Sequence, residues 1–128
     1  MGIKRSTIDT LAANDIALIG IPFDENSSFL QGPAKAPELI IESLESDSAN
    51  FFTENLTDLN EHPRVKWCGN ASPKDYFDIG SPIREILAQD ALPFSLGGDH
   101  SMAYPIMQAL AEKYPNLHII QFDAHGDL

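Results

Sequence analysis

The chain has 128 residues, of which 43% are hydrophobic and 21% are charged, proportions that are normal for a globular protein. This length is sufficient for one domain with its own core and too short for two ordinary domains. Nineteen acidic residues against eight basic ones give a formal net charge of −11, which repels nucleic-acid phosphates and anionic membrane surfaces. The composition therefore argues against nucleic acid and against a membrane as partners.

The single cysteine, Cys68, cannot form a disulfide bond within the chain, which is typical of a reducing compartment. We expect it to be a small, buried hydrophobic residue and not a nucleophile. No apolar stretch approaches the length of a membrane span, and no secretory signal precedes the first apolar run. We therefore expect a cytoplasmic protein.

The first half of the chain predicts a buried strand, a helix and a long connection. Residues 16–21 (Ile-Ala-Leu-Ile-Gly-Ile) are a continuous apolar run, which indicates a central parallel strand covered on both faces. Residues 37–44 begin with proline and mix apolar with acidic residues, which suggests a helix. The polar residues 45–63, rich in Asn and Asp, indicate a connection with little regular structure.

The second half alternates strands and helices at closer spacing. Residues 65–68 indicate a short strand, and residues 81–87 a helix with serine as its N-cap and proline in the first position. Another strand is predicted at residues 92–96, and apolar residues recur at helical spacing between residues 101 and 114. The apolar run at residues 117–122 predicts a last strand.

Strands and helices that alternate in this way predict an α/β fold, in which a parallel sheet is flanked by helices. The carboxyl ends of parallel strands lie at one edge of the sheet, and ligands of such sheets collect at that edge. The segments that directly follow the strands at residues 92–96 and 117–122 are therefore the first candidates for a functional site.

The segment after the last predicted strand, Asp-Ala-His-Gly-Asp, has three possible metal ligands at alternate positions: Asp123, His125 and Asp127. In an extended chain all three side chains leave the same face. Two carboxylates and an imidazole so close together carry an electrostatic cost unless a cation lies between them. Oxygen and imidazole nitrogen donors without a thiolate favour Mn²⁺, with Zn²⁺, Fe²⁺ or Co²⁺ as alternatives.

His100 lies in a Gly-Gly-Asp-His-Ser segment directly after the strand at residues 92–96. We expect Gly97 and Gly98 to supply the positive φ angles of a tight turn. Two interpretations are open for this segment. Either His100 is a fourth metal ligand, or Asp99 or the following serine merely caps the next helix.

A carboxylate such as Asp123 can bridge two ions about 3.5–4 Å apart, and such a pair can activate water to attack an electrophilic carbon at neutral pH. Hydrolysis is therefore the chemistry that the ligand set predicts. Four ligands do not saturate two ions, so we expect further carboxylates to come from sequence outside these residues.

Both polar segments resemble the signatures of the ureohydrolase family, which includes arginase, agmatinase and formimidoylglutamase. Residues 97–101 and 123–127 occur in the order and at about the separation of the family's two motifs. Residues 19–24 (Ile-Gly-Ile-Pro-Phe-Asp) and 32–37 (Gly-Pro-Ala-Lys-Ala-Pro) are similar to the family's opening strand and its Gly-Pro segment. The resemblance implies a three-layer α/β/α, arginase-like fold, with residues 1–128 as the N-terminal portion of a single domain.

By this resemblance, His100 and Asp127 would bind one Mn²⁺, His125 would bind the other, and Asp123 would bridge the two ions. Asp127 would also orient the attacking nucleophile, which makes it the candidate catalytic residue. The resemblance further implies a hydrolase of linear amidine C–N bonds that acts on a small cationic guanidino substrate in polyamine metabolism. Agmatine is expected as the substrate, with arginase or formimidoylglutamase activity as the alternative, and a homo-oligomer is expected when the protein is complete.

The family's later pair of metal-binding aspartates and its later catalytic His or Glu have no counterpart among these residues. We therefore expect the 128 residues alone to be inactive and their last strand to lie at an unprotected edge of an incomplete sheet. The alternative, of a different class, is a non-catalytic metal-binding or interaction module that completes its sheet with a partner.

Overall fold

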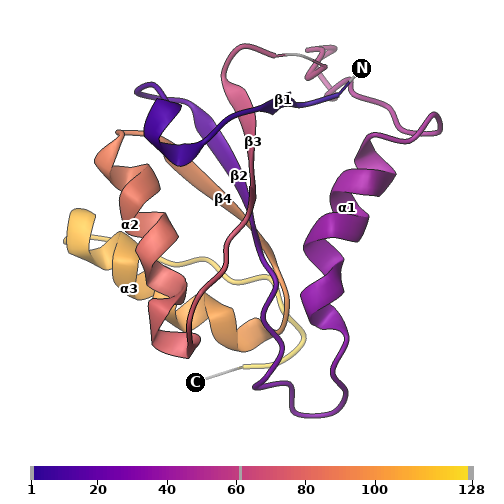
Figure 1. The fold of residues 1–128 in the computed structure, drawn as a ribbon. Helices are drawn as coiled ribbons and strands as arrows, with labels where there is room; N and C mark the ends of the chain where they lie inside the picture. The colour runs from indigo at the N-terminus through magenta and orange to yellow at the C-terminus, as the bar shows by residue number, and fades with distance from the viewer. Residues whose placement is uncertain (1, 61, 127–128) are drawn as a thin grey trace.

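The computed structural model describes residues 2–60 and 62–126 and shows a parallel sheet between two layers of helices (Figure 1). The strands run in the order β1-β3-β2-β4, and every pairing is parallel. The elements are β1 (Lys4–Arg5), β2 (Ile16–Ile21), α1 (Ala36–Leu44), β3 (Val65–Asn70), α2 (Gly80–Ala88), β4 (Leu92–Gly97) and α3 (Ala103–Lys113). The predicted α/β fold with a three-layer arrangement is confirmed.

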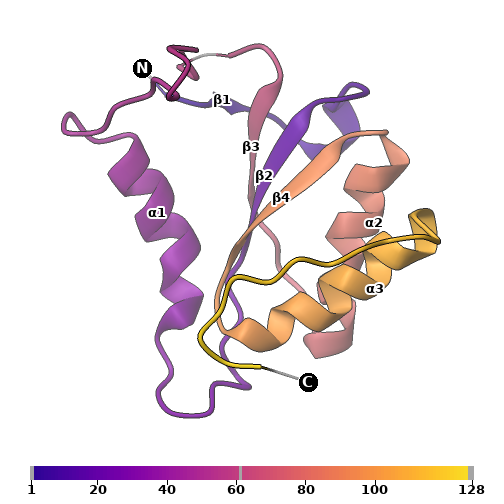
Figure 2. The ribbon, with the colours of Figure 1, turned by 180° about the vertical axis from the view of Figure 1, so that it is seen from behind.

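Helix α1 covers one face of the sheet, and helices α2 and α3 cover the other (Figures 1 and 2). Side chains of β2 alternate between the two layers, because Ile19 packs with Ile83 of α2 while Leu18 packs in the cluster of Ile41 on α1. Full burial of a side chain such as Ile19 stabilises the fold by about 1.5–3 kcal/mol. The expectation that residues 16–21 form a central strand covered on both faces is therefore confirmed.

Strands β3 and β4 and the three α-helices also lie near their predicted positions, β1 was not predicted, and residues 45–63 are indeed a long connection. Its described part contains one isolated antiparallel bridge, between Phe52 and Asp58. Cys68 is half-buried against the core, and burial, the main cause, raises the pKa of its thiol, as expected for a packing residue. No helix in the described part of the chain is long and apolar enough to cross a membrane.

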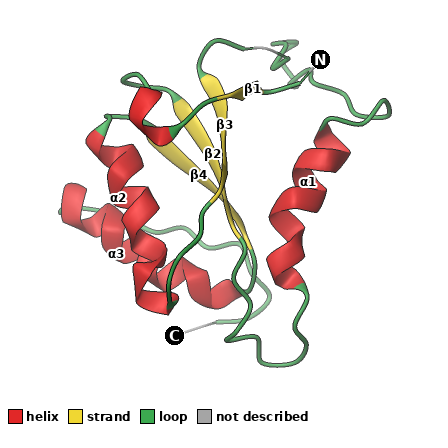
Figure 3. Cartoon of the chain, in the orientation of Figure 1, coloured by secondary structure: helices red, strands yellow, loops and turns green. Residues whose placement is uncertain are grey.

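The strand predicted at residues 117–122 is wrong. This segment follows α3 as a loop and pairs with no strand within the part of the chain that the structure describes (Figure 3). Ile120 and Phe122 are 81% and 97% exposed. An apolar run favours an extended conformation, but a strand also needs a partner for its backbone and cover for its side chains. In Figure 2 the segment returns from the end of α3 toward the carboxyl end of β4 without joining the sheet.

The predicted N-cap of the second helix is also wrong. Helix α2 begins at Gly80 and continues directly from a 3-10 turn, Tyr76–Ile79. The cap is Asp75, whose carboxylate accepts hydrogen bonds from two backbone N–H groups of that turn. The hydroxyl of Ser81 instead donates a 2.7 Å hydrogen bond to the Asp78 carboxylate. Asp75, six residues before the serine, therefore caps the 3-10 turn that leads into α2, and α2 itself has no side-chain cap.

Gly97 and Gly98 do not adopt the positive φ angles expected of them. Their role is to permit close packing. A Cβ atom at Gly98 would overlap the backbone carbonyl oxygen of Phe23, and one at Gly97 would overlap the sulfur of Met102. The ends of β2 and β4 can therefore approach each other this closely only because residues 97 and 98 have no side chains.

We predict that Gly98→Ala lowers the free energy of unfolding by about 1–3 kcal/mol, because a backbone oxygen would have to move to accommodate the new methyl group. Gly126→Ala is the matched control, since a Cβ atom there meets nothing within 4 Å. Chemical denaturation followed by circular dichroism measures both changes. Equal stability of the two variants would contradict the proposed packing role.

Candidate metal centre

The carboxyl ends of β2 and β4 lie side by side, with Ile21 opposite Gly97 at the end of the paired register. Beyond β4 the chain passes through Gly98 and Asp99 into a 3-10 turn, His100–Met102, and then into α3. His100 therefore stands at the edge of the sheet where ligands of parallel sheets collect.

Asp99 starts this turn. Asp99 is buried, with 8% of the residue exposed, and its Oδ1 accepts a 2.9 Å hydrogen bond from the backbone N–H of Ser101. The capping interpretation is thus confirmed for Asp99. This cap does not compete with a ligand role for His100, because it uses the side chain of Asp99 and not that of His100.

Three of the four predicted metal ligands come together at this edge. Nδ1 of His100 lies 3.8 Å from Oδ2 of Asp123, and Nδ1 of His125 lies 3.0 Å from Oδ1 of the same carboxylate. The Asp123 carboxylate therefore has one imidazole beside each of its oxygens. The fourth predicted ligand, Asp127, lies outside the described residues.

The contact between Asp123 and His125 does not arise as the sequence suggested. The chain bends at residues 124 and 125 instead of staying extended, so that the side chains do not simply share one face of a strand. The backbone N–H of His125 donates a 2.8 Å hydrogen bond to Oδ1 of Asp123. Such local turns are a common preference of aspartate, and here the turn brings the imidazole back to the carboxylate.

These contacts keep Asp123 in the form that binds a cation. The hydrogen bond from the His125 backbone, followed by the one from the His125 side chain and by the charges of His125 and His100, lowers the pKa of the Asp123 carboxyl. An ionised carboxylate is the form required of a metal ligand. The side chains of His100 and His125 are 57% and 82% exposed, so the group is open to solvent.

The spacing of these donors is compatible with divalent ions. Two donors that each lie about 2.1 Å from one ion are about 3.0 Å apart at right angles and about 3.4 Å apart at the tetrahedral angle. The His125–Asp123 separation of 3.0 Å lies in this range but is spanned by a direct hydrogen bond, and the His100–Asp123 separation of 3.8 Å is slightly larger. Among residues 2–60 and 62–126, however, no three His, Cys, Asp or Glu side chains form one complete metal-binding group. The described residues therefore fit as part of the donor set of a metal centre and do not form a complete one.

A cavity of about 430 Å³ adjoins His100, and sequence patterns did not predict it. One wall is the turn that carries His100, and the other is the loop after β2, where Phe29 and Leu30 are 90% and 67% exposed. No lysine or arginine is present among the described residues that line it. They are Asn26, Ser27, Ser28, Phe29, Leu30, Pro33, Gly98, Asp99, His100 and Ser101.

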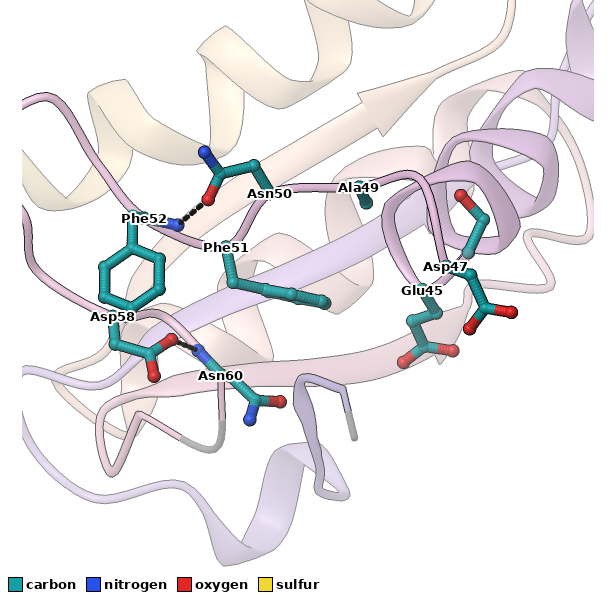
Figure 4. A pocket seen from close by; sticks show the side chains of 9 residues that line it. Glu45, Asp47, Ala49, Asn50, Phe51, Phe52, Asp58 and Asn60 are labelled. Atoms are coloured by element: carbon teal, nitrogen blue, oxygen red, sulfur yellow. Dashed lines mark hydrogen bonds between the residues drawn. The ribbon is translucent and has the colours of Figure 1, made fainter.

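A larger hollow, of about 600 Å³, lies at the opposite edge of the sheet, beyond the end of α1 (Figure 4). Polar side chains there serve the local turns of the connection: Oδ1 of Asn50 accepts from the Phe52 backbone, and Oδ1 of Asp58 accepts from the Asn60 backbone. This hollow lies beyond the amino ends of the strands, away from the candidate His and Asp ligands.

Comparison with known proteins identifies the family of this chain. The model of the Arginase family matches residues 14–128. Arginase 1 of Oryza sativa subsp. indica, named mitochondrial, is 36% identical over 87% of this chain and 36% of its own length. The agmatinase of Bacillus subtilis is 33% identical over 89% of this chain and 41% of its own length. The chain thus spans roughly two fifths of the length of these relatives.

Solved structures of the family share the fold. The arginase from Medicago truncatula aligns with a TM-score of 0.79 and 32% identity, over 90% of this chain and 40% of that one. A formiminoglutamase from Trypanosoma cruzi, solved with Mn²⁺, aligns with a TM-score of 0.60 at 22% identity, over 80% of this chain and 38% of that one, a likeness that concerns the fold alone. The family match over most of the chain confirms the resemblance seen in its two motifs. The chain therefore belongs to the Arginase family.

Proposed function

We propose that the complete protein is a hydrolase of guanidino compounds that uses two Mn²⁺ ions, with agmatine as the substrate and putrescine and urea as the products. Residues 1–128 would be the N-terminal portion of its single domain. The observation that carries this proposal is the Asp123 carboxylate between two imidazoles at the carboxyl edge of the sheet. Membership of a family of arginases and agmatinases supports the reaction class.

In this proposal His100 and Asp127 hold one ion, His125 holds the other, and Asp123 bridges them. The mixed nitrogen and oxygen donors support Mn²⁺, as does the Mn²⁺ in the Trypanosoma cruzi formiminoglutamase structure. Bound Mn²⁺ would supply a Lewis acid that makes water nucleophilic at neutral pH. Asp123 contributes a carboxylate held in its ionised form, and Asp127 would orient the nucleophile.

The cavity beside His100 supports agmatine over arginine. A substrate with a carboxylate is best bound by a lysine or arginine, and neither is present among the described residues that line the cavity. Phe29 and Leu30 instead offer an apolar surface for an aliphatic chain. Arginine is the second candidate, because rice arginase is 36% identical to this chain and the Bacillus agmatinase is 33% identical.

The remaining parts of the proposal concern the partners, the oligomeric state and the cellular location of the protein. A net charge of −11 favours the approach of a cationic substrate and disfavours nucleic acid and anionic membranes as partners. We propose a cytoplasmic homo-oligomer, in which the single cysteine stays reduced. Fractionation and sedimentation of the complete protein test these two points, and the mitochondrial names of plant relatives make the organelle the alternative location.

We predict that His125→Ala in the complete protein abolishes urea release and weakens Mn²⁺ binding by at least about tenfold, because one ion loses its imidazole. The melting temperature should change little, since this side chain is 82% exposed. His118→Ala is the matched control, an exposed histidine of the same segment that is not a proposed ligand. Isothermal titration with Mn²⁺ and a urea assay measure the effects, and full turnover by His125→Ala would disprove the ligand assignment.

We further predict that the complete protein, loaded with Mn²⁺, releases urea from agmatine faster than from arginine or guanidinobutyrate. Treatment with EDTA should remove the activity, and added Mn²⁺ should restore it. The 128 residues alone should be inactive. Faster turnover of arginine would reassign the substrate. A complete protein that binds Mn²⁺ but releases no urea from any of the three would support the non-catalytic metal-binding module instead.

A further inference from the structure

Hydrogen bonds hold the loop at residues 24–32 at its base, at the turn that carries His100, and within the loop itself, where the Ser27 N–H donates to the Asp24 carbonyl. At its base, Oδ2 of Asp24 accepts hydrogen bonds from the backbone N–H groups of Gly32, at 2.6 Å, and Ala34, at 3.2 Å. Further along, the backbone N–H of Asn26 donates a 3.0 Å hydrogen bond to Oδ2 of Asp99, which lies 73 residues away in the sequence. The first contact closes the loop upon itself, and the second attaches it to the turn that carries His100.

Asp99 is the residue that both segments share. Its Oδ1 accepts from Ser101 in the turn, while its Oδ2 accepts from Asn26 in the loop. Its backbone N–H also donates a 2.8 Å hydrogen bond to the carbonyl of Phe23, just before the loop. Because Asp99 is only 8% exposed, these bonds are shielded from water and strengthened by that shielding.

We propose that Asp99 is a positioning residue that fixes the 24–32 loop against the His100 turn and thereby sets the shape of the cavity between them. Phe29 and Leu30 at the tip of the loop are largely exposed, so burial does not hold them in place. The anchor at Asn26 therefore determines where this apolar wall stands relative to His100. This inference rests on the proposed function only for the identity of the bound molecule. In that function, Phe29 and Leu30 would contact the part of the substrate remote from the guanidinium carbon.

A helix cap alone does not require this residue to be aspartate. Serine or asparagine caps about as well, because one acceptor oxygen suffices for the turn. Asp99→Asn therefore separates the two roles. Its amide oxygen can still accept from Ser101, but its NH₂ group would then face the N–H of Asn26, and two donors cannot bond to each other. The turn keeps its cap while the loop loses its anchor.

The first test needs no variant. Amide hydrogen exchange of the 128-residue chain, without metal, should show the Asn26 N–H protected at least about tenfold relative to the N–H of Ser28, for which the structure shows no hydrogen bond. Exchange of the Asn26 amide at its intrinsic rate would overturn the proposal, whatever the protein proves to catalyse.

The second test is limited proteolysis. Chymotrypsin cleavage after Phe29 should be about tenfold faster in Asp99→Asn than in the unaltered chain, well below the melting temperature of both. Asp75→Asn is the matched control, because both acceptor bonds of Asp75 Oδ1 go to its own 3-10 turn and none to the loop. Equal cleavage after Phe29 in Asp99→Asn and Asp75→Asn would overturn the proposal.

The third test uses the complete protein and the urea assay. Asp99→Asn should raise the KM for the guanidino substrate by about tenfold while kcat and the Mn²⁺ affinity stay within about twofold of the original values. A loss of Mn²⁺ affinity with an unchanged KM would show that Asp99 serves only the His100 turn, and would overturn the proposal. If no guanidino compound is cleaved, the proposed function fails, and the exchange and proteolysis results still decide the role of Asp99.

Discussion

Parallel pairing between β2 and β4 is the constraint on which the site depends. The two strands are in register from Ile16 opposite Leu92 to Ile21 opposite Gly97, so both chains leave the sheet at the same level. The absence of a side chain at Gly98 then allows the two departing backbones to touch. A loop and a histidine that are distant in sequence become the two walls of one cavity because of this close approach.

Solvent exposure lowers the electrostatic cost of the charged cluster. The sequence alone suggested that two carboxylates and an imidazole so close together need a cation between them. In the structure the Asp123 carboxylate instead has imidazoles beside both oxygens, and those imidazoles are more than half exposed, so water screens the group.

Local patterns predicted the central elements well, because β2, the helices and β4 each carry their own apolar periodicity. What they could not predict depends on contacts between distant residues. The segment at residues 117–122 looks like a strand but joins no sheet within the described residues, and β1 joins the sheet but is only two residues long. In the same way, the need for glycine at Gly98 arises from Phe23, which no local turn rule includes. The candidate ligands Asp123, His125 and His100 could be predicted because motifs and strand ends are local, whereas the loop wall beside them could not.

The two halves of the candidate metal centre differ in how they are held. His100 stands on a turn whose first residue, Asp99, is buried and bonded to two segments. Asp123 and His125 lie in an exposed segment, and their mutual contact is made within a turn of three residues. The sheet therefore fixes the position of His100, whereas the local sequence fixes the conformation of Asp123 and His125. A cation that binds both halves would join a ligand placed by the sheet to one shaped by its own turn, and the 3.8 Å between His100 and Asp123 is slightly more than the separation of two donors on one ion.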